Sequence, residues 1–197
     1  MGLDMYLEKI PCINGITAQS AHAYGEWLEY IEYIRTPLED GEKEKYTFEE
    51  WVGHALAKSL PEVEVREKLA PYVSIKYDAW DEDKEYPHIG VIDEVGYWRK
   101  ANAIHKWFVD NVQNGVDDCE YHNEVTKEQI EKLVKICEVS LICKTPYLLP
   151  TQSGFFFGGT EYDEYYWKSL EETITMLTKV LEETDFDKYA IYYCSSW

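Results

Sequence analysis

The chain has 197 residues, of which 45% are hydrophobic, so it is long enough for one globular core and is neither a disordered tail nor a coiled rod. Its 19 basic and 38 acidic side chains give a formal net charge of −19, which argues against broad binding to nucleic acid or to anionic membranes, since both are negatively charged. No segment approaches ~18 consecutive apolar residues and no export signal follows Met1, so a cytoplasmic protein is expected.

Hydrophobic periodicity and turn residues predict an α+β fold, with a mainly antiparallel sheet packed against three or four helices in a single domain spanning residues 1–197. The first half is expected to contain, in order, a strand at 3–9, a variable acidic excursion at 10–46 with one short helix or strand, helices at 48–59 and 62–69, and strands at 72–80 and 89–95 that form a hairpin. The second half is expected to contain a helix at 97–113, a short strand at 119–124, a helix reaching 143, a short buried strand at 155–157, a helix at 161–184 and a closing strand at 189–197.

Two of these helices begin with a capping box, in which two side chains satisfy backbone amides that are left unpaired at a helix start. Thr47 and Glu50 have the required spacing, and so do Thr126 and Gln129. The excursion at 10–46 is set apart by its prolines and glycines and by its charge, because residues 26–50 carry nine acidic against three basic side chains.

The segment 97–113 has the opposite charge balance, with three basic side chains against one acidic in a strongly acidic chain. On a helix, Arg99, Asn102 and Lys106 would form a polar stripe with spacings of three and four residues. Trp98 and His105 would border this stripe, and an arginine fork beside an aromatic ring is a typical site for a phosphate or carboxylate that carries a stackable ring.

These features predict a binding site for a small anionic, nucleotide-like ligand, with further aromatic rings from the following helix. The alternative is that the basic side chains pair with surface carboxylates and that the histidine is a hydrogen-bonded core residue. The predicted ligand-binding residues are Trp98, Arg99, Asn102, His105, Lys106, Tyr162 and Trp167.

A second motif, GFFFGGTEYDEYYW at 154–167, places two glycines before a predicted helix start. Backbone amides at a helix start attract phosphate, but the motif lacks the lysine of a P-loop. Glu161, Asp163 and Glu164 would compete with an anion there, which favours a self-capped acidic helix.

Catalytic and metal-binding patterns are incomplete. Cys119 and His122 in DDCEYH resemble a nucleophile pair or two zinc ligands, but three residues apart on a strand they point to opposite faces. His22, His54 and His88 show no ligand spacing, so no metal, no cofactor and no catalytic residue is assigned. Free thiols are expected, because the cysteines are odd in number and form no CxxC pair: Cys12, Cys119, Cys137, Cys143 and Cys194.

Four blocks of the chain resemble a family of small proteins of uncharacterised activity from bacteriophage and bacterial genomes. They are MGLDMYL at the start, YWRKANAIHKWFV at 97–109, GVDDC at 115–119 and LLPTQSGFFFGGTEYDEYYW at 148–167. The resemblance implies no established activity. A phage-type origin would imply a protein of the host cytoplasm that acts by binding, as some small phage proteins cage nucleotide-derived immune signals and others occupy a host enzyme.

Three functional hypotheses follow, in order of preference. The first is a counter-defence module that sequesters a nucleotide-like anion without turnover. The second is an acidic inhibitor or DNA mimic, in which carboxylates in 26–50 and 161–187 face a basic host protein. The third is a small hydrolase-like enzyme that uses His105 or Cys119 with nearby carboxylates. A symmetric homodimer is a secondary expectation, because the many aromatic side chains require burial.

Overall fold

The computed structural model describes residues 2–37, 44–52, 61–119 and 123–197. The fold is α+β, as predicted. The chain groups into two compact units, one formed by residues 1–9 with 94–197 and the other by residues 10–93. Each unit is described by itself below.

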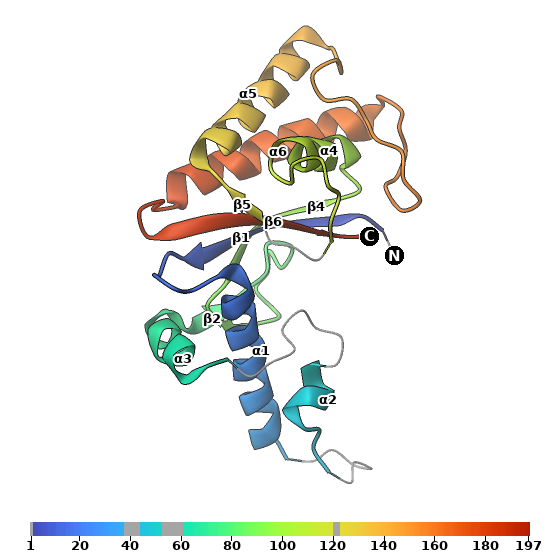
Figure 1. Ribbon diagram of the computed structural model, residues 1–197. Helices are drawn as coiled ribbons and strands as arrows, with labels where there is room; N and C mark the ends of the chain where they lie inside the picture. The colour runs from blue at the N-terminus through green and yellow to red at the C-terminus, as the bar shows by residue number, and fades with distance from the viewer. Residues whose placement is uncertain (1, 38–43, 53–60, 120–122) are drawn as a thin grey trace. The chain divides into compact units, whose positions relative to one another are not determined.

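The first unit is built on a four-stranded antiparallel sheet with the order β4-β1-β6-β5 (Figure 1). Strand β6 is an inner strand, and its pairing with β5 places Asn123 opposite Tyr193 and Val125 opposite Ile191. The bounds are Asp4–Pro11 for β1, Asp93–Arg99 for β4, Asn123–Val125 for β5 and Tyr189–Ser196 for β6.

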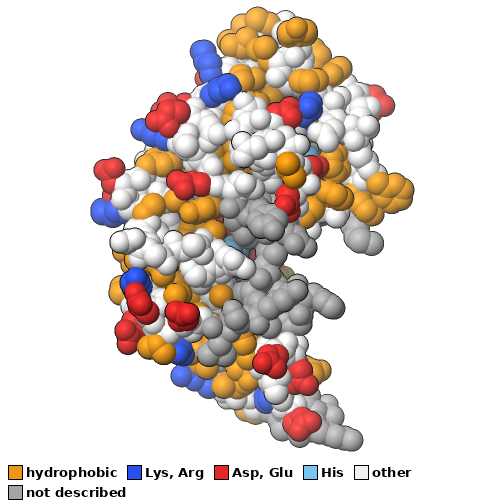
Figure 2. Space-filling model, viewed as in Figure 1, with side chains coloured by type: hydrophobic (Ala, Val, Ile, Leu, Met, Phe, Trp, Pro, Cys, Tyr) orange, Lys and Arg blue, Asp and Glu red, His pale blue; other side chains and the backbone are white. Residues whose placement is uncertain are grey.

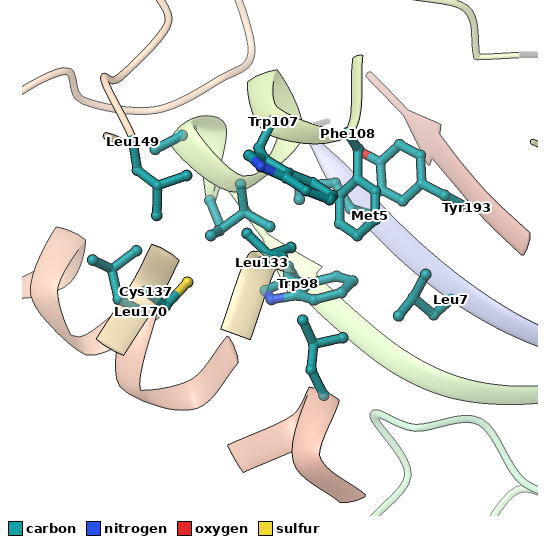
Figure 3. Close-up of a cluster of buried hydrophobic side chains, with 14 of the residues drawn as sticks. Met5, Leu7, Trp98, Trp107, Phe108, Leu133, Cys137, Leu149, Leu170 and Tyr193 are labelled. Carbon is teal, nitrogen blue, oxygen red and sulfur yellow. The ribbon is translucent and has the colours of Figure 1, made fainter. Parts of the chain in front are cut away.

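Three helices cover one face of this sheet: α4 (Asn102–Asn111), α5 (Lys127–Cys143) and α6 (Glu164–Glu183). Their apolar faces meet the buried side chains of the strands in one core (Figure 3). At its centre the Phe108 ring stacks on the Tyr193 ring, with centroids 4.0 Å apart. Met5, Leu7 and Leu170 are fully buried around them. This core fixes the position of α4 on the sheet.

The second unit contains helices α1 (Ala18–Arg35), α2 (Phe48–Val52) and α3 (Val63–Leu69), a 3-10 turn at Ala70–Tyr72, and a two-stranded hairpin. The hairpin pairs β2 (Ser74–Lys76) with β3 (His88–Gly90), so that Ile75 lies opposite Ile89. None of the helices in the described part of either unit is both long and apolar enough to cross a lipid bilayer.

Several local predictions are confirmed. The alternating start of the chain forms β1, the short helix near 62–69 is α3, and the closing strand is β6. Both capping boxes are present: Glu50 N–H donates to Thr47 Oγ1 and Gln129 N–H donates to Thr126 Oγ1. Helix α5 ends at Cys143 as expected. The predicted continuation of α2 to residue 59 lies outside the described residues.

Three predictions are wrong. Residues 10–46 contain the 18-residue helix α1, which a capping box between Thr17 and Ser20 starts and which accommodates Gly25 because a side chain there would meet open space. Residues 97–113 do not form one helix. They form the end of strand β4, a turn and helix α4, so Trp98 and Arg99 lie on β4. The predicted strand at 155–157 is a turn in which Phe155 is 94% exposed.

Boundaries also shift in three places. The predicted strands at 72–80 and 89–95 do form a hairpin, but the second divides into β3 and β4, which belong to different sheets. The short strand expected at 119–124 overlaps β5, which spans Asn123–Val125. Residues 120–122 of the prediction lie outside the described residues. Helix α6 begins at Glu164, because the Asp163 side chain accepts a hydrogen bond from Tyr166 N–H and caps it.

Candidate functional site: a cavity at the start of α4

The turn between β4 and α4 places a lysine in a strained backbone conformation. Lys100 follows the last residue of β4 and has φ = 58°, in the left-handed region that costs a residue other than glycine about 1–2 kcal/mol. Its N–H donates to Leu3 O at 2.7 Å and its carbonyl accepts from Asn102 N–H at 3.0 Å. The sheet therefore holds the strained turn in place. Such strain is concentrated at functional sites in proteins.

The start of α4 has no side-chain cap and no acidic residue in its first turn. The amides of Asn102, Ile104 and His105 donate to backbone carbonyls of the preceding turn. Those of Ala101 and Ala103 donate to no acceptor among the residues that the structure describes. Since unpaired donors at a helix start carry partial positive charge, these two amides form a ready site for an acceptor.

Asn102 joins this turn to the loop that precedes α6. Its buried side-chain amide donates to Phe157 O at 3.0 Å and to Gly159 O at 2.8 Å, and its Oδ1 accepts from Gln152 N–H at 3.1 Å. Three of the hydrogen bonds that the side chain can form are therefore used within the fold. Asn102 consequently holds the loop 152–159 against the start of α4.

Gly158 allows the loop to approach Lys100 closely. Its φ is 87°, and a Cβ atom at this position would lie 3.2 Å from the Cβ of Lys100. A side chain would be strained by the backbone conformation and crowded by the lysine, so glycine is required on both counts.

Between the turn and the loop lies a cavity of about 390 Å³. Its walls come from the end of β4, the start of α4, the loop before α6 and the first turns of α6. Small-molecule sites in proteins commonly measure about 300–1,000 Å³, so this volume fits one small ligand. The lining residues that bear on its chemistry are Arg99, Lys100, Ala101, Asn102, Ala103, Gly158, Gly159, Glu161, Asp163, Tyr165, Lys168 and Glu172.

The charged side chains of the cavity differ in whether they are already paired. Arg99 forms an ion pair with Asp4 at 3.0 Å, and Lys168 contacts Glu172 at 3.3 Å. Lys100 forms no ion pair with any described residue. The three basic and three acidic side chains balance, in a protein of net charge −19, so the cavity is much less negative than the molecule as a whole.

Of the seven predicted ligand-binding residues, the cavity brings together only Arg99 and Asn102. Lys106 lies outside its lining and pairs with Asp110 at 2.8 Å on the exposed side of α4. Trp98 is buried in the core, where its Nε1–H donates to Thr173 Oγ1 at 2.9 Å. These placements follow from the strand-and-turn structure of 97–101, which rotates Trp98 to the core side of the sheet.

The aromatic residues predicted on α6 also lie beside the cavity rather than in its wall. Trp167 donates from Nε1–H to the Tyr162 carbonyl at 3.2 Å, and both rings pack edge-to-face on Tyr166. Tyr165, which was not predicted, does line the cavity, and it is 83% exposed. Its ring is therefore the one available for stacking on a ligand.

His105 is a core histidine. It is fully buried, with Nδ1 2.7 Å from the Tyr193 hydroxyl and Nε2 3.1 Å from Asp117 Oδ2. Burial raises the pKa of Tyr193 well above its usual value, so the hydroxyl stays protonated and donates to Nδ1, while Nε2–H donates to the carboxylate. His105 is outside the lining of the cavity, and its two ring nitrogens are both satisfied.

The cysteine thiols differ in their burial. Burial raises the pKa of Cys137 to about 12 and also raises that of Cys194, which keeps both protonated. Cys119 is half-buried, and His122 lies outside the described residues. None of the five cysteines forms a disulfide, as predicted. Across the described ranges, no group of three or more His, Cys, Asp or Glu side chains has a metal-binding arrangement.

The analysis of the sequence missed Lys100, Lys168, Tyr165 and the unpaired amides. Only one local signal pointed to them, the Arg-Lys pair that immediately precedes α4. Lys168 and Tyr165 come from a helix more than 60 residues away, and only tertiary packing brings them to the turn.

Comparison with models of protein families, with curated proteins and with solved structures found no match to this chain. The resemblance to phage and bacterial proteins therefore remains an expectation.

Proposed function

We propose that the protein binds a small anionic, nucleotide-like ligand without turnover, in the cavity at the start of α4. The observation that carries this proposal concerns three groups in the cavity wall that have no partner among the described residues: the amides of Ala101 and Ala103 and the ammonium of Lys100. These groups are hydrogen-bond donors or positive charges, and their residues line one cavity. A phosphate or carboxylate satisfies all of them at once.

The anionic group of the ligand would lie against the start of α4. There the two amides donate to its oxygens, and the helix dipole favours negative charge. Lys100 supplies a full positive charge, and its side chain lies near the Arg99 guanidinium, because a Cβ atom at Gly2 would be 3.2 Å from Lys100 Cε and 3.4 Å from Arg99 Nη2. Arg99 keeps donors of its guanidinium available, because its ion pair with Asp4 uses only Nη1.

The rest of the ligand would extend toward α6. Tyr165 lies at the rim of the cavity with an exposed ring, and a base or another flat ring can stack on such a face at about 1–3 kcal/mol. Glu161 has no recorded partner among the described side chains and accepts hydrogen bonds from ligand hydroxyl or amino groups. A nucleotide carries an anionic group, hydroxyl groups and a flat ring in that order.

The geometry favours binding over the two other hypotheses. His105 and Cys119 lie outside the lining of the cavity, so the side chains proposed for catalysis do not converge on the ligand. An acidic inhibitor requires a continuous acidic field, but Figure 2 shows basic and acidic side chains interspersed over the visible face of the first unit. Several carboxylates there are paired within one helical turn, for example Asp110 with Lys106 and Glu172 with Lys168.

Calorimetric titration with a nucleotide panel tests the proposal. The panel contains nucleoside monophosphates, cyclic dinucleotides and, as uncharged references, the matching nucleosides. We expect at least one nucleotide to bind and the nucleosides to bind at least tenfold more weakly. Lys100→Gly removes the ammonium and also relieves the strained backbone, so a loss of binding in this variant is not a folding defect.

Lys144→Gly is the matched control, because Lys144 also has a left-handed backbone (φ = 48°) and lies at the end of α5, outside the cavity. It should bind like the wild type. No binding by any nucleotide, or equal affinity of the Lys100→Gly variant and the wild type, would overturn the proposal.

The counter-defence role, a host-protein partner and the homodimer need a separate experiment. Native mass spectrometry of the protein purified from the cells that produce it reports a retained small molecule, a bound protein and the number of subunits in one spectrum. Retention of a nucleotide-derived signal supports sequestration. A stoichiometric host protein in place of a small molecule supports the inhibitor hypothesis instead.

A further inference from the structure

A second cavity, of about 560 Å³, lies within the unit formed by residues 10–93. It is bounded by α1, by Trp51 of α2 and by the β2–β3 hairpin. Its chemistry differs from that of the first cavity, because it contains carboxylates and aromatic rings. Its described lining residues include His88 but no lysine or arginine.

One wall is a pair of stacked aromatic rings. Tyr33 and Trp51 have ring centroids 4.4 Å apart, with an angle of 26° between the ring planes. The face of an aromatic ring carries partial negative charge, and tryptophan attracts a cation most strongly of the aromatic side chains. This wall is therefore suited to a positively charged group.

The Tyr33 ring already accepts a cation from the protein itself. Lys45 Nζ lies 4.2 Å from the centroid of the Tyr33 ring. Elsewhere in this unit the Arg66 guanidinium lies 5.0 Å from the centroid of the Trp27 ring. Ammonium and guanidinium groups on aromatic faces are thus a recurrent contact in residues 10–93.

Two carboxylates face the cavity from α1. Glu29 and Glu32 are three residues apart, which places them on one side of the helix. Neither forms an ion pair with a described residue. Partial burial raises the pKa of Glu29, with smaller contributions from the Glu26 and Asp78 carboxylates, while the nearby His88 opposes the shift. The net rise means that the environment disfavours the negative charge of Glu29.

The hairpin supplies an apolar side to the cavity. Ile75 and Ile89 lie opposite each other across β2 and β3 and are 64% and 37% exposed, and both line the space. Exposed isoleucine side chains at a cavity favour a ligand that presents alkyl groups. The cavity therefore combines apolar, aromatic and anionic walls.

We propose that this cavity binds a small organic cation, an alkylated ammonium ion, independently of the anion site at α4. Its charge would be shared between the Glu29 and Glu32 carboxylates and the Trp51 ring, since Lys45 already lies over the Tyr33 ring. Its alkyl groups would contact Ile75 and Ile89. A small inorganic cation does not use the apolar and aromatic walls. An anion is repelled by both carboxylates.

Choline is the probe for the test, and 3,3-dimethyl-1-butanol, which has the same shape without the charge, is the matched reference. Calorimetric titration of the full chain at pH 8 should show binding of choline and at least tenfold weaker binding of the alcohol. Glu29→Gln and Trp51→Leu should each weaken choline binding at least fivefold. Glu26→Gln, which changes a neighbouring carboxylate outside the lining, should leave it within twofold of the wild type.

Glu29→Gln keeps the test valid if Trp51→Leu does not fold, since it preserves the shape of the side chain. Lys100→Gly should bind choline like the wild type, which separates failure at this site from failure at the anion site. Equal binding of choline and the alcohol, no effect of Glu29→Gln, or no binding of choline at millimolar concentration would overturn the proposal.

Discussion

The side-chain amide of Asn102 lies 2.8 Å from the carbonyl oxygen of Gly159, across 57 residues of sequence. This contact and the one to Phe157 tie the loop before α6 to the start of α4. The cavity therefore has a fixed wall before any ligand arrives. Preformed walls lower the conformational cost of binding.

Replacing Asn102 should weaken both the fold and the binding of the ligand. Asn102→Ala leaves two backbone carbonyls and one amide without their partner, so the free energy of unfolding should fall by about 2–3 kcal/mol. Asn111→Ala, which removes a half-buried amide on the same helix, should cost about 1 kcal/mol. Urea denaturation measures both values. Equal losses of stability in the two variants would contradict the role of Asn102 in holding the loop 152–159 against the start of α4.

Glycine at position 100 and glycine at position 144 should have different effects on ligand binding but similar effects on stability. Lys100→Gly and Lys144→Gly each remove steric strain, so each should keep or raise the free energy of unfolding, by up to about 1 kcal/mol. Thermal and urea unfolding measure this change. A fall of more than about 1 kcal/mol in Lys100→Gly alone would mean that its side chain holds the turn together.

The hydrogen bond from Tyr193 to His105 should contribute to stability rather than to any chemistry. Tyr193→Phe leaves Nδ1 of the buried imidazole without a donor, and the expected loss is about 1–3 kcal/mol. Tyr189→Phe on the same strand removes a hydroxyl that forms no hydrogen bond with any residue the structure describes, and it should cost less than about 0.5 kcal/mol. Nucleotide binding should be unchanged in both. Loss of binding in Tyr193→Phe with unchanged stability would contradict the structural role.

Alkaline pH should destabilise the protein through its buried thiol. Burial raises the pKa of Cys137 from 9.0 to about 12 in the folded state. The unfolded chain therefore binds fewer protons between these values, so the free energy of unfolding falls as pH rises, by up to about 1.4 kcal/mol per pH unit for one such group. Urea titrations from pH 7 to pH 11 measure this slope. Stability that is constant over this range would contradict a buried, protonated thiol.

Thiol labelling gives an independent check of the same burial. Cys12 and Cys143 are exposed, whereas Cys137 and Cys194 are buried. An aromatic disulfide reagent at pH 8 should modify the two exposed thiols promptly and the two buried ones only on unfolding. Mass spectrometry of the digested protein identifies the modified residues. Early modification of Cys137 would show that the α5–α6 contact opens in the native state.

Local patterns predicted the parts of the fold that are stabilised locally. Strand β1 follows from its alternation, and α5 follows from the capping box at Thr126 together with an apolar face at helical spacing. The long helix α1 was missed, because Pro and Gly on either side suggested a broken segment although its own capping box was present at Thr17.

The site was predicted less well, for a physical reason. Helical spacing in 97–113 was counted from Tyr97, but the backbone reverses at Lys100, and nothing in the residue types fixes a left-handed lysine. The hydrogen bond from Lys100 N–H to Leu3 O, between residues 97 positions apart, stabilises that conformation. Arg99 and Asn102 therefore line the cavity from the end of a strand and the start of a helix, rather than from one helix face as expected. Lys106 and Trp98 do not line it.

The most direct test of the anion site observes its two amides. In a ¹⁵N-labelled sample titrated with the tightest-binding nucleotide of the panel, the amide resonances of Ala101 and Ala103 should shift downfield in a saturable manner, since both protons gain an acceptor. The corresponding nucleoside should leave them in place. If the nucleotide saturates the protein while these two resonances do not move, the ligand binds elsewhere and the start of α4 is not the site.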